Sequence, residues 1–165
     1  MKIKILWILL FATSSFLSSN VNGSKTGDLT IYTFEEFEHW LYKETDSLYV
    51  INFWATWCAP CVKEIPDFEK IYDKYKTDKV KVLFVSLDFP AHIDNRVLPF
   101  IERMNMKAQV VLLDDPRSNR WIPEVSEKWT GSIPATLVYN NEFRKFYERE
   151  FNFEELEGII IPLLK

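Results

Sequence analysis

The sequence contains few of the residues on which most catalytic and metal-binding motifs depend. Its 165 residues include only two cysteines, two histidines and four glycines. Two cysteines exclude a framework of several disulfides, and we find no phosphate-binding glycine loop, cofactor fingerprint or Ser-His-Asp set. Lysine and arginine total 20 against 24 aspartates and glutamates, which gives a formal charge of −4. This balance argues against a nucleic-acid surface, which needs a basic patch.

The remaining composition indicates one folded domain. Hydrophobic residues make up 47% of the chain and aromatic residues 16%. A chain of 165 residues fits a single domain that buries a sizeable core without extra cross-links. The aromatic share predicts a core rich in Phe, Tyr and Trp, each of which buries a large area.

Residues 1–23 have the pattern of a secretory signal peptide. Lys2 and Lys4 precede an apolar core over residues 5–11, and a serine-rich polar stretch follows. An uncleaved membrane anchor is the alternative, although the apolar run is shorter than the roughly 20 residues that a spanning helix needs. We expect cleavage, a mature single domain over residues 24–165, and a periplasmic or otherwise extracytoplasmic location, where disulfides persist.

Hydrophobic periodicity divides the rest of the chain into strands and helices. Thr33, with Glu36 three residues on, forms a capping box that predicts a helix start, and Asn152 caps the last helix. Between residues 117 and 129 we expect a loop with a helical turn or two after Pro123. The predicted strands cover residues 29–32, 48–54, 80–87, 109–113, 135–139 and 143–150, and the predicted helices cover 33–44, 58–75, 93–104 and 153–163.

This order of elements predicts an α/β fold with a mostly parallel sheet. Crossover helices cover both faces of such a sheet, and the last two strands close it as an antiparallel hairpin. The run 48–54 is apolar without alternation, so we expect it to form a central strand that is buried on both faces.

The two cysteines, Cys58 and Cys61, lie three residues apart where that strand leads into the next helix. Their spacing allows one tight disulfide or half of a metal site. A structural zinc site takes four ligands, and the chain offers only His39 and His92 besides, neither of them spaced as a partner. The residues therefore favour disulfide chemistry, and half a zinc site is the alternative.

The residues around the pair resemble the thioredoxin fold and, within it, the TlpA/ResA-type branch of secreted thiol-disulfide oxidoreductases. The resemblance rests on the run Phe53-Trp54-Ala55-Thr56-Trp57-Cys58-Ala59-Pro60-Cys61, on Pro66 in the next helix, and on Ile133-Pro134 before a late strand. It covers residues 29–165, including a strand-helix-strand block at 80–113 that is typical of that branch. It implies a thioredoxin-like fold, with a central mixed sheet flanked by helices on both faces.

The resemblance also implies a role for each residue of the motif. Cys58 attacks the substrate disulfide, because the N–H groups and the dipole at a helix N-terminus stabilise its thiolate. Cys61 then resolves the mixed disulfide. Ala59-Pro60 shapes the turn and helps to set the redox potential. Ile133-Pro134, with a cis peptide bond, docks the substrate strand. The redox-active pair needs no cofactor.

Two polar residues depart from the pattern of thioredoxins proper. In those proteins a buried Asp six residues before the first cysteine assists proton transfer, and this chain has Asn52 there, which cannot ionise. Glu64, three residues after Cys61, matches a glutamate of the TlpA/ResA branch. We expect Glu64 to tune the pKa values of the thiols and to relay the proton. A solvated helix glutamate is the alternative.

Three tryptophans are candidates for an apolar rim around the exposed sulfur. Trp57 is adjacent to Cys58 in the sequence and is the one that we expect to contact the substrate. Trp121 and Trp129 approach the site only if the loop before Pro134 folds over it, and packing in the core explains them equally well.

These observations predict a monomeric, secreted enzyme that reduces protein disulfides. The Ala59-Pro60 pair and the resemblance to reductases, including those that serve cytochrome c maturation, favour this direction. It requires a membrane electron donor of the DsbD or CcdA kind. A peroxidase of the related redoxin group is an alternative, although Trp57 replaces the Thr or Pro expected before a peroxidatic cysteine. The non-enzymatic alternative is a thioredoxin-fold binding module, such as a metal carrier.

Overall fold

The computed structural model describes residues 24–26 and 29–164. The predicted signal peptide at residues 1–23 lies outside the described residues. Within the part that is described, no helix has both the length and the apolar character needed to cross a membrane.

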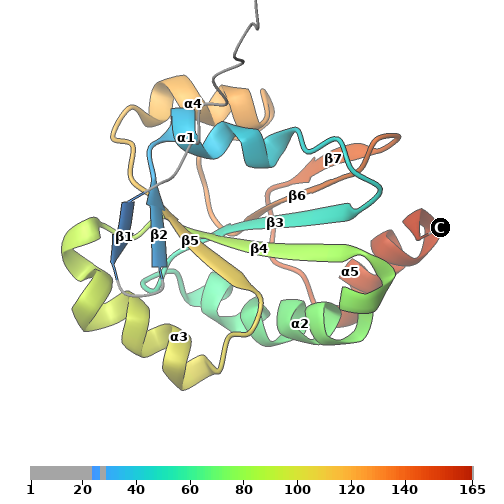
Figure 1. Ribbon diagram of the computed structural model, residues 1–165, viewed down its shortest axis with the longest axis horizontal. Coiled ribbons are helices and arrows are strands. Elements are labelled where there is room, and N and C mark those ends of the chain that lie inside the picture. The colour runs from blue at the N-terminus through green and yellow to red at the C-terminus, as the bar shows by residue number, and fades with distance from the viewer. Residues whose placement is uncertain (1–23, 27–28, 165) are drawn as a thin grey trace, which may run out of the picture.

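The described residues form one mixed sheet of seven strands in the order β1-β2-β5-β4-β3-β6-β7 (Figure 1). The four strands from β2 to β3 are parallel to one another, and β6 and β7 close the sheet as an antiparallel hairpin. The predicted α/β architecture is therefore confirmed. The strands are β1 (Ser24–Thr26), β2 (Leu29–Tyr32), β3 (Leu48–Trp54), β4 (Val80–Ser86), β5 (Gln109–Leu113), β6 (Ala135–Tyr139) and β7 (Arg144–Tyr147).

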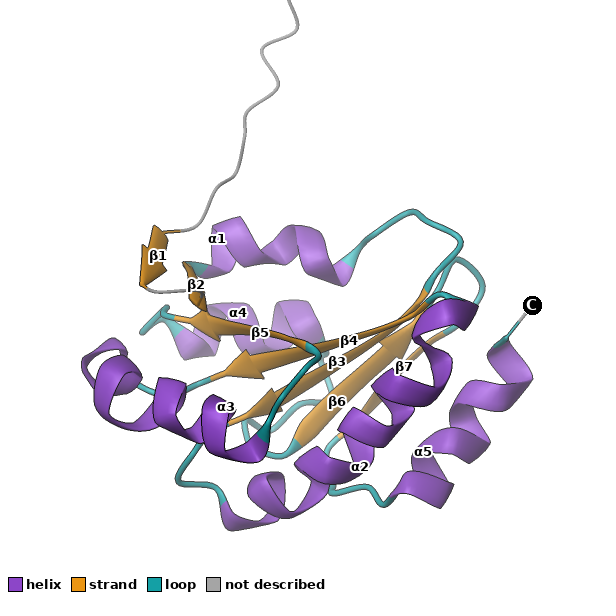
Figure 2. Cartoon of the chain, turned by 60° about the horizontal axis from the view of Figure 1, so that its bottom comes forward, coloured by secondary structure: helices purple, strands orange, loops and turns teal. Residues whose placement is uncertain are grey.

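Helices cover both faces of this sheet (Figures 1 and 2). α1 and α4 lie on one face, and α2, α3 and α5 lie on the other. The α-helices are α1 (Phe34–Phe37), α2 (Ala59–Tyr75), α3 (Leu98–Met104), α4 (Ser118–Val125) and α5 (Phe153–Ile160). Short 3-10 turns are η1 (Glu38–Leu41), η2 (Lys76–Asp78), η3 (Pro90–His92) and η5 (Ile161–Leu163), and η4 (Ile93–Val97) is a π-helical turn.

Aromatic side chains fill the core on each side of the sheet, as the composition predicts. On the α2 side the ring of Phe68 lies 6.0 Å from that of Phe84, and on the α1 side the ring of Phe37 lies 6.1 Å from that of Phe53. All four side chains are fully buried. Burial of a side chain of this size stabilises the fold by about 1.5–3 kcal/mol.

β3 is the central strand, and it positions the two halves of the site. All seven of its residues are buried, as its continuous apolar run predicts. It pairs in parallel with β4 and antiparallel with β6, where Phe53 faces Ala135. Because β6 runs the opposite way, its first residue lies beside the end of β3. The cysteine turn that follows Trp54 and the segment that precedes Ala135 therefore meet at one edge of the sheet.

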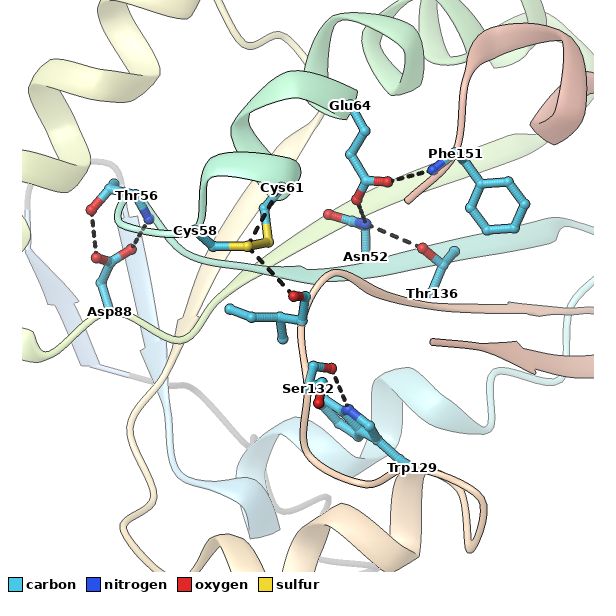
Figure 3. Close-up of a disulfide and its surroundings, with 11 residues drawn as sticks. Asn52, Thr56, Cys58, Cys61, Glu64, Asp88, Trp129, Ser132, Thr136 and Phe151 are labelled. Atoms are coloured by element: carbon cyan, nitrogen blue, oxygen red, sulfur yellow. Dashed lines mark hydrogen bonds between the residues drawn. A yellow bond between two sulfur atoms is a disulfide. The ribbon is translucent and has the colours of Figure 1, made fainter. Parts of the chain in front are cut away.

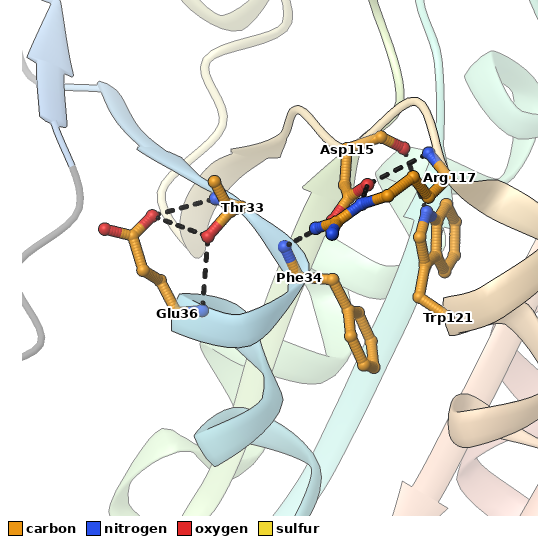
Figure 4. A network of polar contacts seen from close by, with 6 residues as sticks. All are labelled: Thr33, Phe34, Glu36, Asp115, Arg117 and Trp121. Atoms are coloured by element: carbon orange, nitrogen blue, oxygen red, sulfur yellow. Dashed lines mark hydrogen bonds and ion pairs between the residues drawn. The ribbon is translucent and has the colours of Figure 1, made fainter.

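The first helix is capped as predicted but ends earlier. Thr33 and Glu36 form both bonds of the capping box (Figure 4). The α-helix gives way to the η1 turn, which ends at Leu41, three residues before the predicted end. The hydroxyl of Tyr139 donates to the carbonyl of Trp40 at 2.6 Å and accepts the N–H of Lys43 at 3.2 Å. These bonds to β6 use backbone groups that a longer helix would need.

The segment 117–129 contains a helix that the sequence does not predict. α4 starts at Ser118 and continues through Pro123, so the expectation of helical turns only after that proline is wrong. The indole N–H of Trp121 donates to the carbonyl of Asp115 at 2.9 Å, and its ring stacks 5.9 Å from that of Phe34 (Figure 4). These contacts with Asp115 and with α1 order the helix despite the missing N–H of the proline.

Other boundaries also differ from the prediction, and β4 and α2 are each one residue shorter than predicted. The segment 93–104 is helical throughout, but it begins as the η4 turn before α3. Pro99 is tolerated because it stands in the first turn of α3, where its missing N–H is not needed. β7 covers 144–147 rather than 143–150.

Candidate active site

Cys58 and Cys61 form a disulfide at the N-terminus of α2 (Figure 3). Their Cα atoms are 5.3 Å apart. Cys58 is the N-cap residue of the helix, and its Sγ accepts the N–H of Cys61 at 3.3 Å. The two cysteines differ in access, since Cys58 is 6% exposed and Cys61 is fully buried. A thiol partner therefore reaches the sulfur of Cys58 first.

The turn between β3 and α2 is held by short-range bonds. The N–H of Cys58 donates to the carbonyl of Ala55 at 3.1 Å, and the N–H of Val62 donates to the carbonyl of Cys58 at 3.0 Å. Pro60 stands in the first turn of the helix, where its fixed φ suits the helix and its missing N–H costs nothing. Ala59 and Pro60 thus form the first two residues of α2.

Asp88, in the loop after β4, fixes the same turn from the neighbouring strand (Figure 3). Its Oδ2 accepts the N–H of Thr56 at 2.9 Å, and its Oδ1 accepts the Thr56 hydroxyl at 2.6 Å. The hydroxyl of Ser86 also donates to Oδ2, at 2.9 Å. Asp88 is only 2% exposed, and these three donors offset the cost of burying its carboxylate.

The peptide bond between Ile133 and Pro134 is cis, as the resemblance implies. The carbonyl oxygen of Ile133 lies 3.6 Å from the Sγ of Cys58. In the disulfide this sulfur carries no proton, so the contact is one of packing. A substrate strand that pairs with the backbone of Ile133 would lie directly against the sulfur of Cys58.

The segment before Pro134 is held from two sides. The N–H of Ser132 donates to Glu148 Oε1 at 2.9 Å, and its carbonyl accepts the indole N–H of Trp129 at 2.8 Å (Figure 3). The N–H and the hydroxyl of Thr130 also donate to Glu148. These bonds hold residues 130–132 in place, although they belong to no strand.

Glu64 is buried in the interior behind the cysteine pair (Figure 3). Its Oε1 accepts the Nδ2 group of Asn52 at 2.7 Å, and its Oε2 accepts the N–H of Phe151 at 2.8 Å. Asn52 also donates to the hydroxyl of Thr136 at 3.1 Å. Glu64 is 1% exposed, which excludes the alternative of a solvated helix glutamate.

The burial of Glu64 changes its acidity. Desolvation raises the pKa of its carboxyl from 4.5 to about 7, against the opposing effect of the hydrogen bonds from Phe151 and Asn52. A carboxyl with a pKa near neutrality exchanges its proton readily at physiological pH. Asn52 cannot ionise as the aspartate at this position of thioredoxins proper does, but it donates a hydrogen bond to Glu64, which does ionise.

The three tryptophans have different environments. Trp57 is 57% exposed, whereas Trp121 and Trp129 are 6% and 5% exposed. The last two belong to the core on the α1 side of the sheet, where their rings lie 5.6 Å apart. Core packing is thus the correct interpretation for Trp121 and Trp129, and only Trp57 offers an apolar surface beside Cys58.

Sequence reasoning does not find Asp88 or Glu148. Asp88 is a single acidic residue after a strand, and nothing in the sequence indicates that it reaches Thr56. Glu148 stands in the run Glu148-Arg149-Glu150, which is typical of a solvated face. Both act through contacts with distant segments, which local patterns do not reveal.

The two histidines lie on other elements than the cysteine pair. His39 is part of η1 and lies 5.3 Å from the ring of Trp40, and His92 ends η3 and lies 5.9 Å from the ring of Phe89. The described part of the chain contains no group of three or more His, Cys, Asp and Glu residues placed to hold a metal ion.

The chain is similar to proteins named thiol-disulfide oxidoreductase ResA. The protein of that name from Geobacillus kaustophilus is 26% identical over an alignment 167 residues long, which covers 95% of this chain and 91% of the relative. The one from Bacillus thuringiensis strain Al Hakam is 36% identical over 113 residues, which cover 67% of this chain and 60% of the relative.

Solved structures share the fold. StoA from Bacillus subtilis superposes with a TM-score of 0.54 at 24% identity, over 70% of this chain and 83% of StoA. A secreted thiol-disulfide isomerase from Corynebacterium glutamicum superposes with a TM-score of 0.61 at 21% identity, over 72% of this chain and 71% of that one. At these identities the likeness establishes the thioredoxin-like fold alone.

A disulfide at a strand-to-helix junction of this fold, in a chain related to ResA proteins, defines a thiol-disulfide oxidoreductase. The predicted enzyme class and the resemblance to the ResA type are both confirmed. The chain belongs to the AhpC/TSA family, whose model matches residues 26–143.

Proposed function

We propose that this protein works outside the cytoplasm and reduces disulfides in client proteins. The observation that carries the proposal is the asymmetry of the pair. Cys58 is at the helix N-terminus, 3.6 Å from the carbonyl of Ile133, and Cys61 is buried behind it. One sulfur can thus meet a client strand while the other waits for the second step.

The reaction takes place in two exchanges. In the reduced enzyme the Cys58 thiolate attacks one sulfur of the client disulfide, forms a bond to it and releases the other client sulfur as a thiolate. The Cys61 thiolate then attacks the Sγ of Cys58, which forms the enzyme disulfide and releases the second client thiolate. Two electrons pass to the client, and the two protons that the enzyme thiols lose balance those that the client thiols gain.

The N-terminus of α2 favours the first exchange. In the disulfide the N–H of Cys61 already points at the Sγ of Cys58, at 3.3 Å. A thiolate at this sulfur would accept the same N–H and lie at the positive end of the helix dipole, and both effects stabilise its negative charge. Cys58 is therefore the nucleophile.

Glu64 favours the second exchange. It lies one helical turn after Cys61 in α2, and its pKa of about 7 lets it take up a proton at neutral pH. We assign to Glu64 the removal of the proton from Cys61, which makes the resolving thiolate. Substrate docking is assigned to Trp57, Ala59-Pro60 and Ile133-Pro134.

The direction and the partners complete the proposal. The ResA relatives are named oxidoreductases without a direction, and the C. glutamicum structure is of a secreted protein. Reduction of clients outside the cytoplasm needs a continuous supply of electrons, which we assign to a membrane donor of the DsbD or CcdA kind. We further propose that the enzyme works as a monomer. Apocytochrome c in the course of maturation is one client class that fits. The cysteine pair acts without a cofactor.

A redox titration against glutathione tests the direction. We expect a potential near that of thioredoxin, about −270 mV, whereas a value near that of DsbA, about −120 mV, would make the enzyme an oxidant. A peroxide consumption assay on the same protein tests the peroxidase alternative. We expect no turnover there, because the exposed indole of Trp57 occupies the position before Cys58.

A further inference from the structure

A cleft of about 360 Å³ opens beside the cysteine turn. One wall comes from Trp57 and from Val62 in the first turns of α2, and the other comes from Phe100 in α3 and the η4 turn before it. The N–H of Val62 donates to the carbonyl of Cys58. The cleft therefore begins within one helical turn of the nucleophile.

The walls of this cleft offer apolar contact. Trp57 is 57% exposed, and Phe100 is buried at the base with 4% exposure. Val62 is half-buried against the same core. The described residues leave more than half of this indole uncovered beside the reactive sulfur, and apolar side chains of a client fit such a surface.

Two arginines give the rim of the cleft a positive charge. Arg96, in η4, and Arg103, in α3, are both exposed, and the guanidinium of Arg103 lies 5.1 Å from the ring of Phe100. Across the described residues, neither of them has a carboxylate within ion-pair distance.

The nearest basic residue in the sequence to the cysteine pair differs from these two arginines. Lys63, in α2 next to Val62, pairs with Glu150. The chain as a whole has a formal charge of −4. Two guanidinium groups without a carboxylate partner among the described residues, at the rim of an apolar cleft in an acidic protein, attract a carboxylate and can bind it in the bidentate geometry.

We propose that this cleft selects clients in which an acidic residue and an apolar residue adjoin the reactive cysteine. The apolar side chain packs against Trp57 and Val62, above the buried ring of Phe100, and the carboxylate pairs with Arg96 and Arg103. The backbone next to the cysteine lies on the opposite side of the sulfur, against Ile133. This inference rests on the proposed disulfide exchange and adds the sequence preference of its clients.

Two peptides test the preference. Each contains one disulfide loop, and they differ only in having Glu-Leu or Gln-Leu next to the attacked cysteine. The reduced full chain is mixed with each peptide in single turnovers, and acid quench with thiol alkylation gives the second-order rate constant. We expect faster reduction of the Glu-Leu peptide, with an advantage that shrinks as salt rises from about 20 mM to about 200 mM.

Arginine variants locate the effect. Arg96→Gln and Arg103→Gln should each slow reduction of the Glu-Leu peptide about two- to fivefold, the range of exposed ion pairs, and leave the Gln-Leu peptide unchanged. Arg120→Gln, in α4 on the other face of the sheet, is the matched control and should change neither rate. Arg103→Glu should reverse the charge preference, so that this variant reduces a Lys-Leu peptide faster than the Glu-Leu peptide.

The outcomes separate the two proposals. If wild-type protein reduces both peptides at equal rates and the arginine variants leave the ratio unchanged, the docking proposal is overturned while disulfide exchange stands. If wild-type protein reduces neither peptide nor any other disulfide, the proposed function fails and the docking proposal fails with it.

Discussion

The Oε1 of Glu64 lies 2.7 Å from the Nδ2 of Asn52, and both side chains are buried behind the cysteine pair. The other amide atom of Asn52, Oδ1, is buried and has no hydrogen-bond partner in the described structure. A half-turn of the amide would present Oδ1 to Glu64. The protonated carboxyl could then donate to it, so Asn52 can serve both protonation states of Glu64.

The stability of the oxidised protein should fall as the pH rises through the range in which Glu64 ionises. Its folded pKa is about 7 against 4.5 for a free side chain, so the folded state keeps a proton that the unfolded state loses. The free energy of unfolding should therefore decrease between these pH values, by at most about 3 kcal/mol. Urea unfolding of the oxidised protein from pH 4.5 to 8 measures this.

Glu64→Gln should remove this contribution to the slope. Its amide can donate to Asn52 Oδ1 and accept from Phe151, so the variant keeps its hydrogen bonds. Glu127→Gln, at an exposed position, is the control and should follow the wild-type curve. Parallel curves for Glu64→Gln and wild type would contradict the raised pKa of the buried Glu64 carboxyl.

The same substitution should slow the second exchange. General base catalysis is worth about a hundredfold or more, and Glu64→Gln removes it from the step in which Cys61 becomes a thiolate. We expect release of the client from the mixed disulfide to slow by about that factor at pH 7, with little change in the first attack. Quenched-flow measurements of the mixed disulfide separate the two steps, and equal release rates would sink the assignment.

Cysteine variants should reveal which sulfur attacks. Cys61→Ser leaves Cys58 able to attack but removes the resolving thiol, so the mixed disulfide should accumulate. Cys58→Ser should trap little client, because Cys61 is fully buried. Mass spectrometry of the adducts after incubation with a disulfide peptide gives the answer, and equal trapping by both variants would contradict the proposed order.

Asp88→Asn should loosen the turn that carries the nucleophile. Thr56 and Ser86 donate hydrogen bonds to both carboxylate oxygens of Asp88. In the variant the amide nitrogen would replace one of these oxygens and leave a donor without an acceptor, and a buried unsatisfied group costs about 1–3 kcal/mol. We expect that loss in urea unfolding, together with a slower first exchange. Asp114→Asn, at an exposed position one residue past β5, should change stability by less than about 0.5 kcal/mol.

Two glycine substitutions should act in opposite directions. Gly131 has a φ of +96°, and a Cβ there would lie 3.3 Å from the Cδ1 of Ile122, so Gly131→Ala should destabilise the protein by about 1–2 kcal/mol. Gly158 is in α5, and a Cβ there meets nothing within 4 Å. Gly158→Ala should stabilise by up to about 1 kcal/mol. Thermal unfolding of the two variants compares them directly.

The elements with a strong local signal are those that the sequence predicts best. β3, β5 and β6 have the predicted bounds, because continuous apolar runs between polar turns leave little choice of boundary. The early end of the first helix comes from the Tyr139 hydroxyl, and α4 is ordered by the anchoring of Trp121 on Asp115 and Phe34. Both are effects of distant residues on short segments.

The residues of the candidate active site also divide into those that local sequence motifs predict and those that depend on distant residues. The cysteine pair and Ile133-Pro134 are predictable from sequence motifs, and the structure brings them together as expected. The position of Glu64 follows from the resemblance, but its burial depends on Phe151 and Asn52, which are distant in sequence. The bonds of Asp88 and Glu148 are beyond local reasoning, since each carboxylate meets its donors only once the chain has folded.

The bond between Asp88 and Thr56 also separates two parts of the connection between β4 and β5. It ties the start of the connection between β4 and β5 to the cysteine turn, while the rest of that connection carries Arg96 and Arg103 on the cleft. Ile93, Val97 and Phe100 of this connection are buried in the core, and Phe100 packs on Trp54. Exchange of its exposed residues alone, for those of a relative with other charges, should therefore transfer client preference and leave the reduction potential of the host unchanged.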